Sequence, residues 1–245
     1  MMRRAAFLMA GLLALGLPTL AGSIELSSLF NTIKQAIKPA SLDDELEIGK
    51  DAAATLLGAS KPITDAPVQE YVNKVGLWVA LQSDRPDLPW HFAVVDSDDI
   101  DAFAAPGGYV FITRGLLLHM RSEAELAGVL GHEITHVVLK HHLNELQRAA
   151  RLDLAGLAAQ AELEKNGHST AIADKVTAAT RNLYSKGLDK DDEFDADRAG
   201  VVLAARAGYE PYGLLAVLQT LEGVDPKSGK VQLLLATHPS PADRI

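Results

Sequence analysis

The clearest hydrophobic pattern in the chain lies between Ser122 and Gln147, where apolar side chains recur at the spacing of one helix face. Ser122 and Glu125 stand three residues apart, as in a capping box, which marks the start of a helix. The pattern therefore predicts one unbroken helix over 122–147. Its apolar positions are Leu126, Val129, Leu130, Val137, Leu139 and Leu143.

Similar patterns predict further helices on both sides of this segment. Capping residues and a first-turn proline favour helices over 41–57 and 65–82. Another helix is expected from residue 190, where the first turn is acidic, and a further one over 210–221. The alanine-rich stretch 152–179 predicts one or two helices, either as a mobile flap or as an ordinary connection.

Three short segments have the composition of strands. Residues 90–95 alternate between apolar and more polar side chains and are rich in β-branched residues. Residues 102–105 and 109–113 flank the turn sequence Pro106-Gly107-Gly108. The last two predict a hairpin whose first arm is an edge strand. That strand is either purely structural or able to bind an extended peptide. Together with the helices, these segments predict an α+β fold that is mostly helical with a small β-sheet.

The predicted helix over 122–147 contains the sequence His132-Glu133-Ile134-Thr135-His136. Residues four apart lie on the same helix face, so His132 and His136 can present two imidazoles to one metal ion. Glu133 then lies beside that ion, where it can act as a general base. A chance occurrence is the alternative interpretation. The apolar flanking residues favour the metal site, because they indicate a buried segment in which unpaired imidazoles would be costly.

A catalytic metal site of this kind needs a third protein ligand, and His142 is one candidate. Its spacing matches a longer zinc motif in which a glycine turns the chain. Here Leu139, a good helix former, occupies the turn position. If the helix continues, His141 and His142 point away from the other two histidines, and we expect them to make surface or interdomain contacts.

The second candidate is Glu193, which lies in the acidic run that opens the helix expected from residue 190. Glu193 and Asp197 are four residues apart and share one face of that helix. Glu193 can ligate the metal while Asp197 accepts the free ring N–H of a ligand histidine. The alternative is an ordinary solvated acidic face.

The motif 132–136, followed by 193–197 and Gly200, resembles the glutamate-zinc metallopeptidases of family forty-eight, the HtpX, BepA and LoiP type. Two further segments carry the likeness. They are the strand-turn-strand 101–117 and the C-terminal Thr237-His238-Pro239-Ser240 with Arg244-Ile245. The likeness covers residues 42–245. Asp101 departs from the pattern, since members of this family often carry asparagine there, and the departure puts one local hydrogen bond in question.

This resemblance implies a zincin-like metalloprotease domain that binds one zinc ion through His132, His136 and Glu193. Water activated by Glu133 would then attack the scissile carbonyl of a peptide bond. The implied substrates are unfolded or misassembled proteins of the cell envelope. The alternative function is a chaperone-like zinc protein that binds unfolded chains with little or no proteolysis, although a binding protein has no need of a general base.

The C-terminal segment has an implied role in the same site. The resemblance places His238 near the metal, either as a donor to the tetrahedral oxyanion or as a fourth ligand that holds the enzyme inactive. Arg244 either orients this segment or forms a plain surface salt bridge, and we favour the salt bridge.

The N-terminal sequence predicts export. Residues 1–21 combine two arginines, a short apolar run and small residues before a cleavage point, as in a signal peptide, although an uncleaved anchor is the alternative. A polar linker over 22–40 would then precede the domain 41–245, in the periplasm or another exported compartment. No later apolar stretch is long enough for a membrane span. The absence of cysteine excludes disulfides and a lipid-modified cysteine.

The charge of the chain bears on its partners. The formal net charge of −9 becomes −11 when Arg3 and Arg4 are removed with the signal peptide. A strongly acidic body argues against a nucleic-acid partner.

Overall fold

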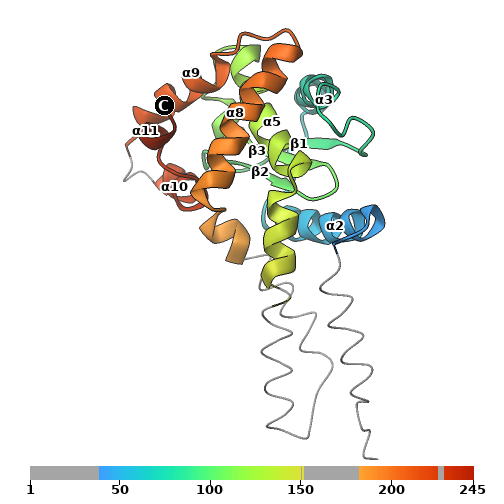
Figure 1. Cartoon of the computed structure of the whole chain (residues 1–245). Coiled ribbons are helices and arrows are strands. Elements are labelled where there is room, and N and C mark those ends of the chain that lie inside the picture. The colour runs from blue at the N-terminus through green and yellow to red at the C-terminus, as the bar shows by residue number, and fades with distance from the viewer. Residues whose placement is uncertain (1–38, 150, 152–181, 226–228) are drawn as a thin grey trace, which may run out of the picture.

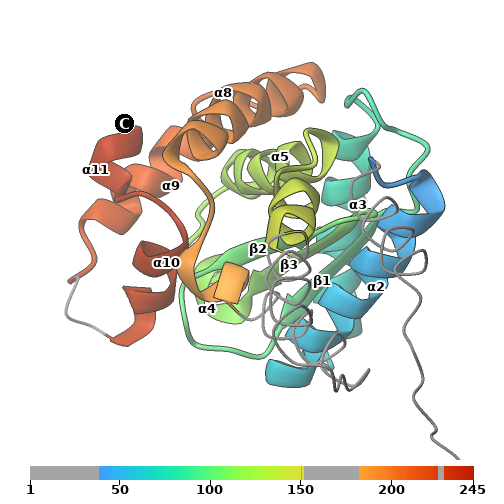
Figure 2. The same ribbon diagram turned by 60° about the horizontal axis from the view of Figure 1, so that its bottom comes forward.

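A three-stranded sheet with helices on both faces forms the body of the chain in the computed structural model, which describes residues 39–149, 151, 182–225 and 229–245 (Figures 1 and 2). The fold is α+β and mostly helical, which confirms the prediction. In chain order the elements are α2 (Leu42–Ala59), α3 (Ala66–Ala80), β1 (His91–Val95), β2 (Ala102–Ala105), β3 (Tyr109–Thr113), α4 (Arg114–Leu117), α5 (Glu123–Val138), α8 (Lys190–Arg206), α9 (Gly213–Glu222), the 3-10 helix η1 (Gly229–Val231), α10 (Gln232–Thr237) and α11 (Pro241–Arg244).

Three of the predicted segments fall wholly or almost wholly outside this description. The predicted signal peptide and nearly all of the linker lie outside the described residues, and so does the alanine-rich stretch 152–179. Within the part that the structure describes, no helix is both long enough and apolar enough to cross a bilayer.

The sheet has the strand order β1-β3-β2. Strands β1 and β3 are parallel, whereas β2 and β3 form the antiparallel hairpin that was predicted. Its turn contains Gly107 and Gly108 with φ of 75° and 102°, which side-chain-bearing residues rarely adopt. Among the described residues, strand β2 pairs only with β3, so it is an edge strand of this sheet, as expected.

Each face of the sheet packs against a different set of helices. Val94, Ile112 and Ala104 belong to the main core with α3 and α5, while Phe111 and Ala105 on the opposite face pack against α2. This alternation follows from the two-residue period of a strand. Both faces are apolar because helices cover each of them, although Phe103 on the α2 face also lines the cleft. Figure 2 shows the sheet between α5 on one side and α2 on the other.

Helices α5 and α8 lie side by side and approach each other through two glycines (Figure 1). A Cβ atom on Gly131 would lie 2.6 Å from the Gly200 carbonyl oxygen, and one on Gly200 would lie 2.6 Å from the His132 backbone nitrogen. Only glycine permits such a contact between two helix backbones. The contact brings Glu193 on α8 opposite the two histidines of α5.

The prediction of one helix over 122–147 is wrong. Helix α5 ends at Val138, residues 139–140 form a turn, and a new helical segment covers 141–149. Lys140 has a φ of 62°, a left-handed conformation that costs a non-glycine residue about 1–2 kcal/mol.

An ion-pair network centred on the buried Glu45 carboxylate lies at this turn. The Glu45 carboxylate is fully buried and binds the Arg85 guanidinium through oxygen–nitrogen distances of 2.7 and 3.0 Å. Lys140 Nζ lies 3.2 Å from the same carboxylate, and Arg85 also donates to the Val137 carbonyl at the end of α5. These tertiary contacts outweigh the helix propensity of Leu139 and Lys140.

Candidate active site

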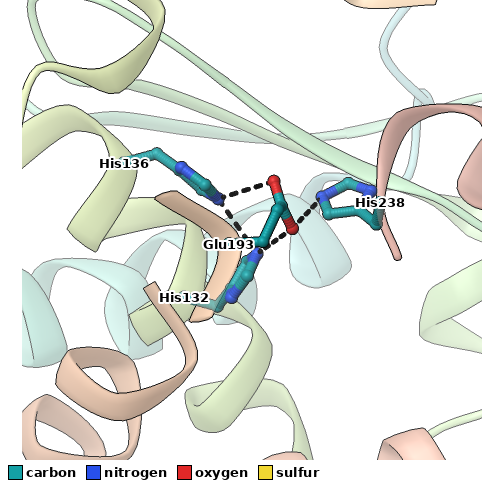
Figure 3. A group of neighbouring side chains, drawn as sticks. All are labelled: His132, His136, Glu193 and His238. Atoms are coloured by element: carbon teal, nitrogen blue, oxygen red, sulfur yellow. Dashed lines mark hydrogen bonds and ion pairs between the residues drawn. The ribbon is translucent and has the colours of Figure 1, made fainter. Parts of the chain in front are cut away.

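The two motif histidines, His132 and His136, are almost completely buried on α5. Since one turn of helix separates them, their Nε2 atoms come within 3.0 Å of each other, as Figure 3 shows. Two bare nitrogen lone pairs at this distance repel unless a cation or a proton lies between them. The pair is therefore arranged to hold a positively charged species.

Glu193 supplies the third group from α8. Its carboxylate oxygens lie 3.6 Å from His132 Nε2 and 3.5 Å from His136 Nε2 (Figure 3). A zinc ion bound by nitrogen and oxygen at about 2.0–2.1 Å in a tetrahedron separates its ligand atoms by about 3.3 Å. The His132–His136 separation of 3.0 Å is slightly shorter than this value, and the two separations to Glu193 are slightly longer. Glu193 Oε2 is also buried without a hydrogen-bond partner. These residues therefore fit a zinc ion.

Asp197 lies one turn beyond Glu193 and contacts the far side of the His132 ring. Its Oδ1 atom is 2.9 Å from His132 Nδ1, which fixes the tautomer with a proton on Nδ1 and leaves Nε2 able to ligate. Arg244 from α11 binds both oxygens of the Asp197 carboxylate. The Arg244 side chain is 5% exposed, so the expectation of a surface salt bridge is wrong.

The metal-free site has strongly shifted pKa values. Burial and the positive charge of Arg244 act to lower the pKa of His132, but the close contact with the Asp197 carboxylate and the nearby Glu193 carboxylate outweigh them and raise it to about 9. Burial opposes ionisation of Glu193, yet its pKa is lowered to about 2 by the positive charge that His238 carries in acid and by the nearby His132 ring. The two carboxylates therefore favour a positive charge at His132.

Glu133 is buried between the metal group and a cleft. Its Oε2 atom has no hydrogen-bond partner, a costly arrangement for a buried carboxylate unless a ligand fills the space. Burial raises its pKa to about 7, and the charge of Glu193 acts in the same direction. A carboxylate with this environment can exchange protons at neutral pH.

His238, at the end of α10, faces the same group from the opposite side (Figure 3). Its Nε2 atom lies 3.8 Å from Glu193 and 3.9 Å from Glu133, and its Nδ1 atom lies 3.9 Å from Asp101. Burial lowers the pKa of His238 to about 4, so its ring is neutral at pH 7. One ligand atom each from His132, His136, Glu193 and His238 lies within 4.8 Å of all the others.

Asp101, which departs from the sequence pattern of the resembling family, is buried directly before β2. Its Oδ1 atom accepts the Ala102 N–H at 3.0 Å, so a hydrogen bond is made at this position. Burial and the nearby charge of Glu133 raise the pKa of Asp101 well above its usual range.

His141 and His142 do not lie where the sequence placed them. The turn at Lys140 redirects the chain, so both rings approach His136, with centroid distances of 5.1 and 5.3 Å. His141 is 6% exposed, and its Nδ1 atom is 2.9 Å from His136 Nδ1. The prediction of surface contacts is therefore wrong. His142 stacks on Tyr184 instead, and its nitrogens are not among the atoms that converge on the metal group.

A cleft of about 810 Å³ opens onto Glu133, Glu193 and His238. Strand β2 forms one wall through Ala102 and Phe103, and α2 forms another. Tyr184 crosses the edge of β2, where its hydroxyl donates to the Ala104 carbonyl at 2.8 Å. The cleft therefore joins this edge of β2 to the Glu133 carboxylate.

Sequence reasoning missed Tyr184, the approach of His141 to His136 and the burial of Arg244. Only the burial of Arg244 had a signal in the sequence. A guanidinium in the C-terminal segment can form an ion pair with a carboxylate of the acidic run 191–197. Neither Tyr184 nor His141 stands in a local pattern that predicts its contact.

Two buried histidines of one helix, a glutamate of a second helix and a further glutamate whose Oε2 atom has no partner form the arrangement typical of metal-dependent hydrolases. The comparisons with known proteins agree: the sequence profile of peptidase family M48 matches residues 66–245, and the chain belongs to this family.

Several relatives span the same region. The chain is 27% identical over 211 residues to the β-barrel assembly-enhancing protease of Escherichia coli strain K12, covering 84% of this chain and 43% of that protein. The protein of the same name in Yersinia pestis is 29% identical with the same coverage. The mitochondrial metalloendopeptidase OMA1 of Schizosaccharomyces pombe is 27% identical over 84% of this chain and 60% of its own length. The chain thus spans less than half of the bacterial relatives.

Proposed function

We propose that this chain is a zinc-dependent metalloendopeptidase that hydrolyses unfolded or misassembled proteins of the cell envelope. The observation that carries the proposal is the convergence of His132, His136 and Glu193 on one point, with the unpartnered Oε2 of Glu133 beside it. This donor set, two imidazoles and one carboxylate in a hydrolase motif, is typical of catalytic zinc.

Each residue then has a distinct task. His132, His136 and Glu193 hold the ion, and Asp197 keeps His132 in the ligating tautomer. The zinc ion, when bound, polarises a water molecule and the scissile carbonyl. Glu133 removes a proton from the attacking water and delivers it to the leaving amine, a task that suits its raised pKa.

His238 completes the site in one of two ways. As a neutral ring it can donate a hydrogen bond to the developing oxyanion, or its Nε2 can occupy the fourth position and hold the enzyme inactive. Its Nε2 atom is 3.8 Å from Glu193, a separation compatible with both arrangements.

The substrate binds, in this proposal, as an extended strand along the edge of β2 that faces the cleft, where it would displace the Tyr184 hydroxyl from the Ala104 carbonyl. Such binding uses main-chain hydrogen bonds, which favours unfolded segments over folded domains. The relatives whose names refer to β-barrel assembly suggest misassembled outer-membrane proteins as one substrate class. The domain 41–245 would act in the periplasm after removal of the signal peptide 1–21.

Digestion of one protein in two states tests this function. The zinc-loaded chain is incubated with a globular protein in its native form and with the same protein reduced and alkylated so that it stays unfolded. We expect cleavage of the unfolded form, little cleavage of the native form, and loss of cleavage in the presence of a zinc chelator. Binding of the unfolded form without any cleavage would instead favour the chaperone-like function.

A further inference from the structure

The turn that ends α5 places a second histidine against the metal ligand His136. His136 Nδ1 and His141 Nδ1 are 2.9 Å apart, and both side chains are buried. This contact depends on the left-handed conformation of Lys140, which the ion pair with Glu45 holds from a distant helix. The protein thus pays a local conformational cost to bring His141 to this position.

Chemistry determines the direction of the hydrogen bond. His136 directs Nε2 toward Glu193, so this nitrogen must be bare when it ligates a metal ion. A neutral His136 then carries its proton on Nδ1 and donates it to His141 Nδ1. Two nitrogens that both carried protons, or both lacked them, could not form a contact of 2.9 Å.

The same reasoning extends one step further. Because His141 accepts on Nδ1, its own proton lies on Nε2, which faces Asp192 Oδ1 at 3.6 Å. Asp192 is adjacent in sequence to the ligand Glu193 on α8. Each of these two histidines of α5 thus has a carboxylate of α8 on its far side: Asp197 contacts His132 at 2.9 Å, and Asp192 lies 3.6 Å from His141, which contacts His136.

We propose that His141 is a positioning residue that holds His136 in its ligating tautomer and raises its affinity for the metal. The proposal deepens the metal-site assignment and rests on the proposed function. His141 does not touch the converging ligand atoms and acts only through the far nitrogen of His136. Loss of such an acceptor behind a ligand histidine lowers metal affinity by about ten- to hundredfold.

Two substitutions separate the hydrogen bond from the packing of the ring. His141→Asn places an amide oxygen where Nδ1 stood and keeps an acceptor for His136, whereas His141→Leu fills the space without one. His141→Met, which is flexible and apolar, takes the place of leucine if that variant does not fold. His142→Leu is the matched control, because it removes the neighbouring buried ring but no contact to a ligand nitrogen.

The measurement is the zinc dissociation constant of each full-length chain, determined by competition with a chromophoric chelator, together with thermal unfolding of the zinc-free proteins. We expect His141→Leu to bind zinc about ten- to hundredfold more weakly than wild type. We also expect His141→Asn to retain most of the zinc affinity and His142→Leu to bind zinc as wild type does. The thermal stabilities of the zinc-free proteins should not rank the variants in the order of their zinc affinities.

Different results overturn different claims. Equal zinc affinity in wild type and His141→Leu, or equally weak affinity in His141→Asn and His141→Leu, overturns the role of His141 and leaves the metal site intact. A wild-type chain that binds no zinc overturns the proposed metal site and this inference with it.

Discussion

Asp197 Oδ1 lies 2.9 Å from His132 Nδ1, so a carboxylate of α8 sets the tautomer of a histidine on α5. Replacing Asp197 by asparagine keeps the shape of the side chain but removes its charge. The amide can also turn its NH2 group toward His132 Nδ1, and in that orientation it cannot accept the Nδ1–H. We expect Asp197→Asn to weaken zinc binding by about ten- to hundredfold, measured by chelator competition. Asp195→Asn on the exposed side of the same helix is the control and should bind zinc as wild type does.

The Arg244–Asp197 ion pair is buried, whereas Arg198–Asp195 on the same helix is exposed. Arg244→Met takes the guanidinium away from the Asp197 carboxylate and leaves the His132 ring as its remaining partner, so we expect a loss of up to about 3–5 kcal/mol in the free energy of unfolding. Arg198→Met should cost at most about 1 kcal/mol. Urea unfolding of the zinc-free variants measures both values. Similar losses in the two variants would contradict the buried role of Arg244.

The zinc-free protein should lose stability as the pH rises from about 6.5 to 9. The pKa of His132 is raised in the folded chain, so its protonated form stabilises the fold below the unfolded pKa of 6.5, and this contribution disappears as the pH passes about 9. The shift corresponds to at most about 3 kcal/mol. Urea unfolding across this pH range should show a decline in the free energy of unfolding of wild type. The decline should be smaller in Asp197→Asn, which lacks the carboxylate that contacts His132 Nδ1. The same slope in both proteins would exclude His132 as its source.

The glycine contact between α5 and α8 positions the ligands, so enlarging it should disturb both fold and site. A methyl group on Gly200 would meet the His132 backbone nitrogen at 2.6 Å, and neither helix backbone can yield easily. We expect Gly200→Ala to destabilise the protein by about 1–3 kcal/mol and to weaken zinc binding.

Gly58 in α2 provides the matched control for that substitution. A Cβ atom there meets nothing within 4 Å, so Gly58→Ala should be neutral or stabilising by up to about 1 kcal/mol. Unfolding curves and chelator competition on both variants measure the difference. A Gly200→Ala protein as stable as Gly58→Ala would show that the helices can separate freely.

Much of the fold could be predicted because its signals are local. The hairpin over 102–105 and 109–113 was predicted to the residue, since its turn glycines and apolar arms are adjacent in sequence. Helix α8 was predicted from its acidic first turn and small apolar residues. The one helix that was predicted wrongly, over 122–147, ends early because Glu45 and Arg85 act on it from positions far away in the sequence.

The candidate site could be predicted to a similar extent. His132, Glu133 and His136 stand in one short motif, and helical spacing alone relates Glu193 to Asp197. The approach of His238 depends on the packing of the C-terminal segment, and it was expected only through the family resemblance. The contact of His141 with His136 requires a left-handed lysine, and nothing in the local sequence predicts that conformation.

The central claim is that Glu133 acts as the general base beside a zinc ion held by His132, His136 and Glu193. Glu133→Gln removes the base while keeping the side-chain shape and all three ligands. Digestion of unfolded casein by this variant and by wild type, with the zinc content of each measured in the same preparations, tests the claim directly. The account predicts equal zinc content, cleavage by wild type and no cleavage by Glu133→Gln, whereas equal cleavage by the two proteins would contradict it.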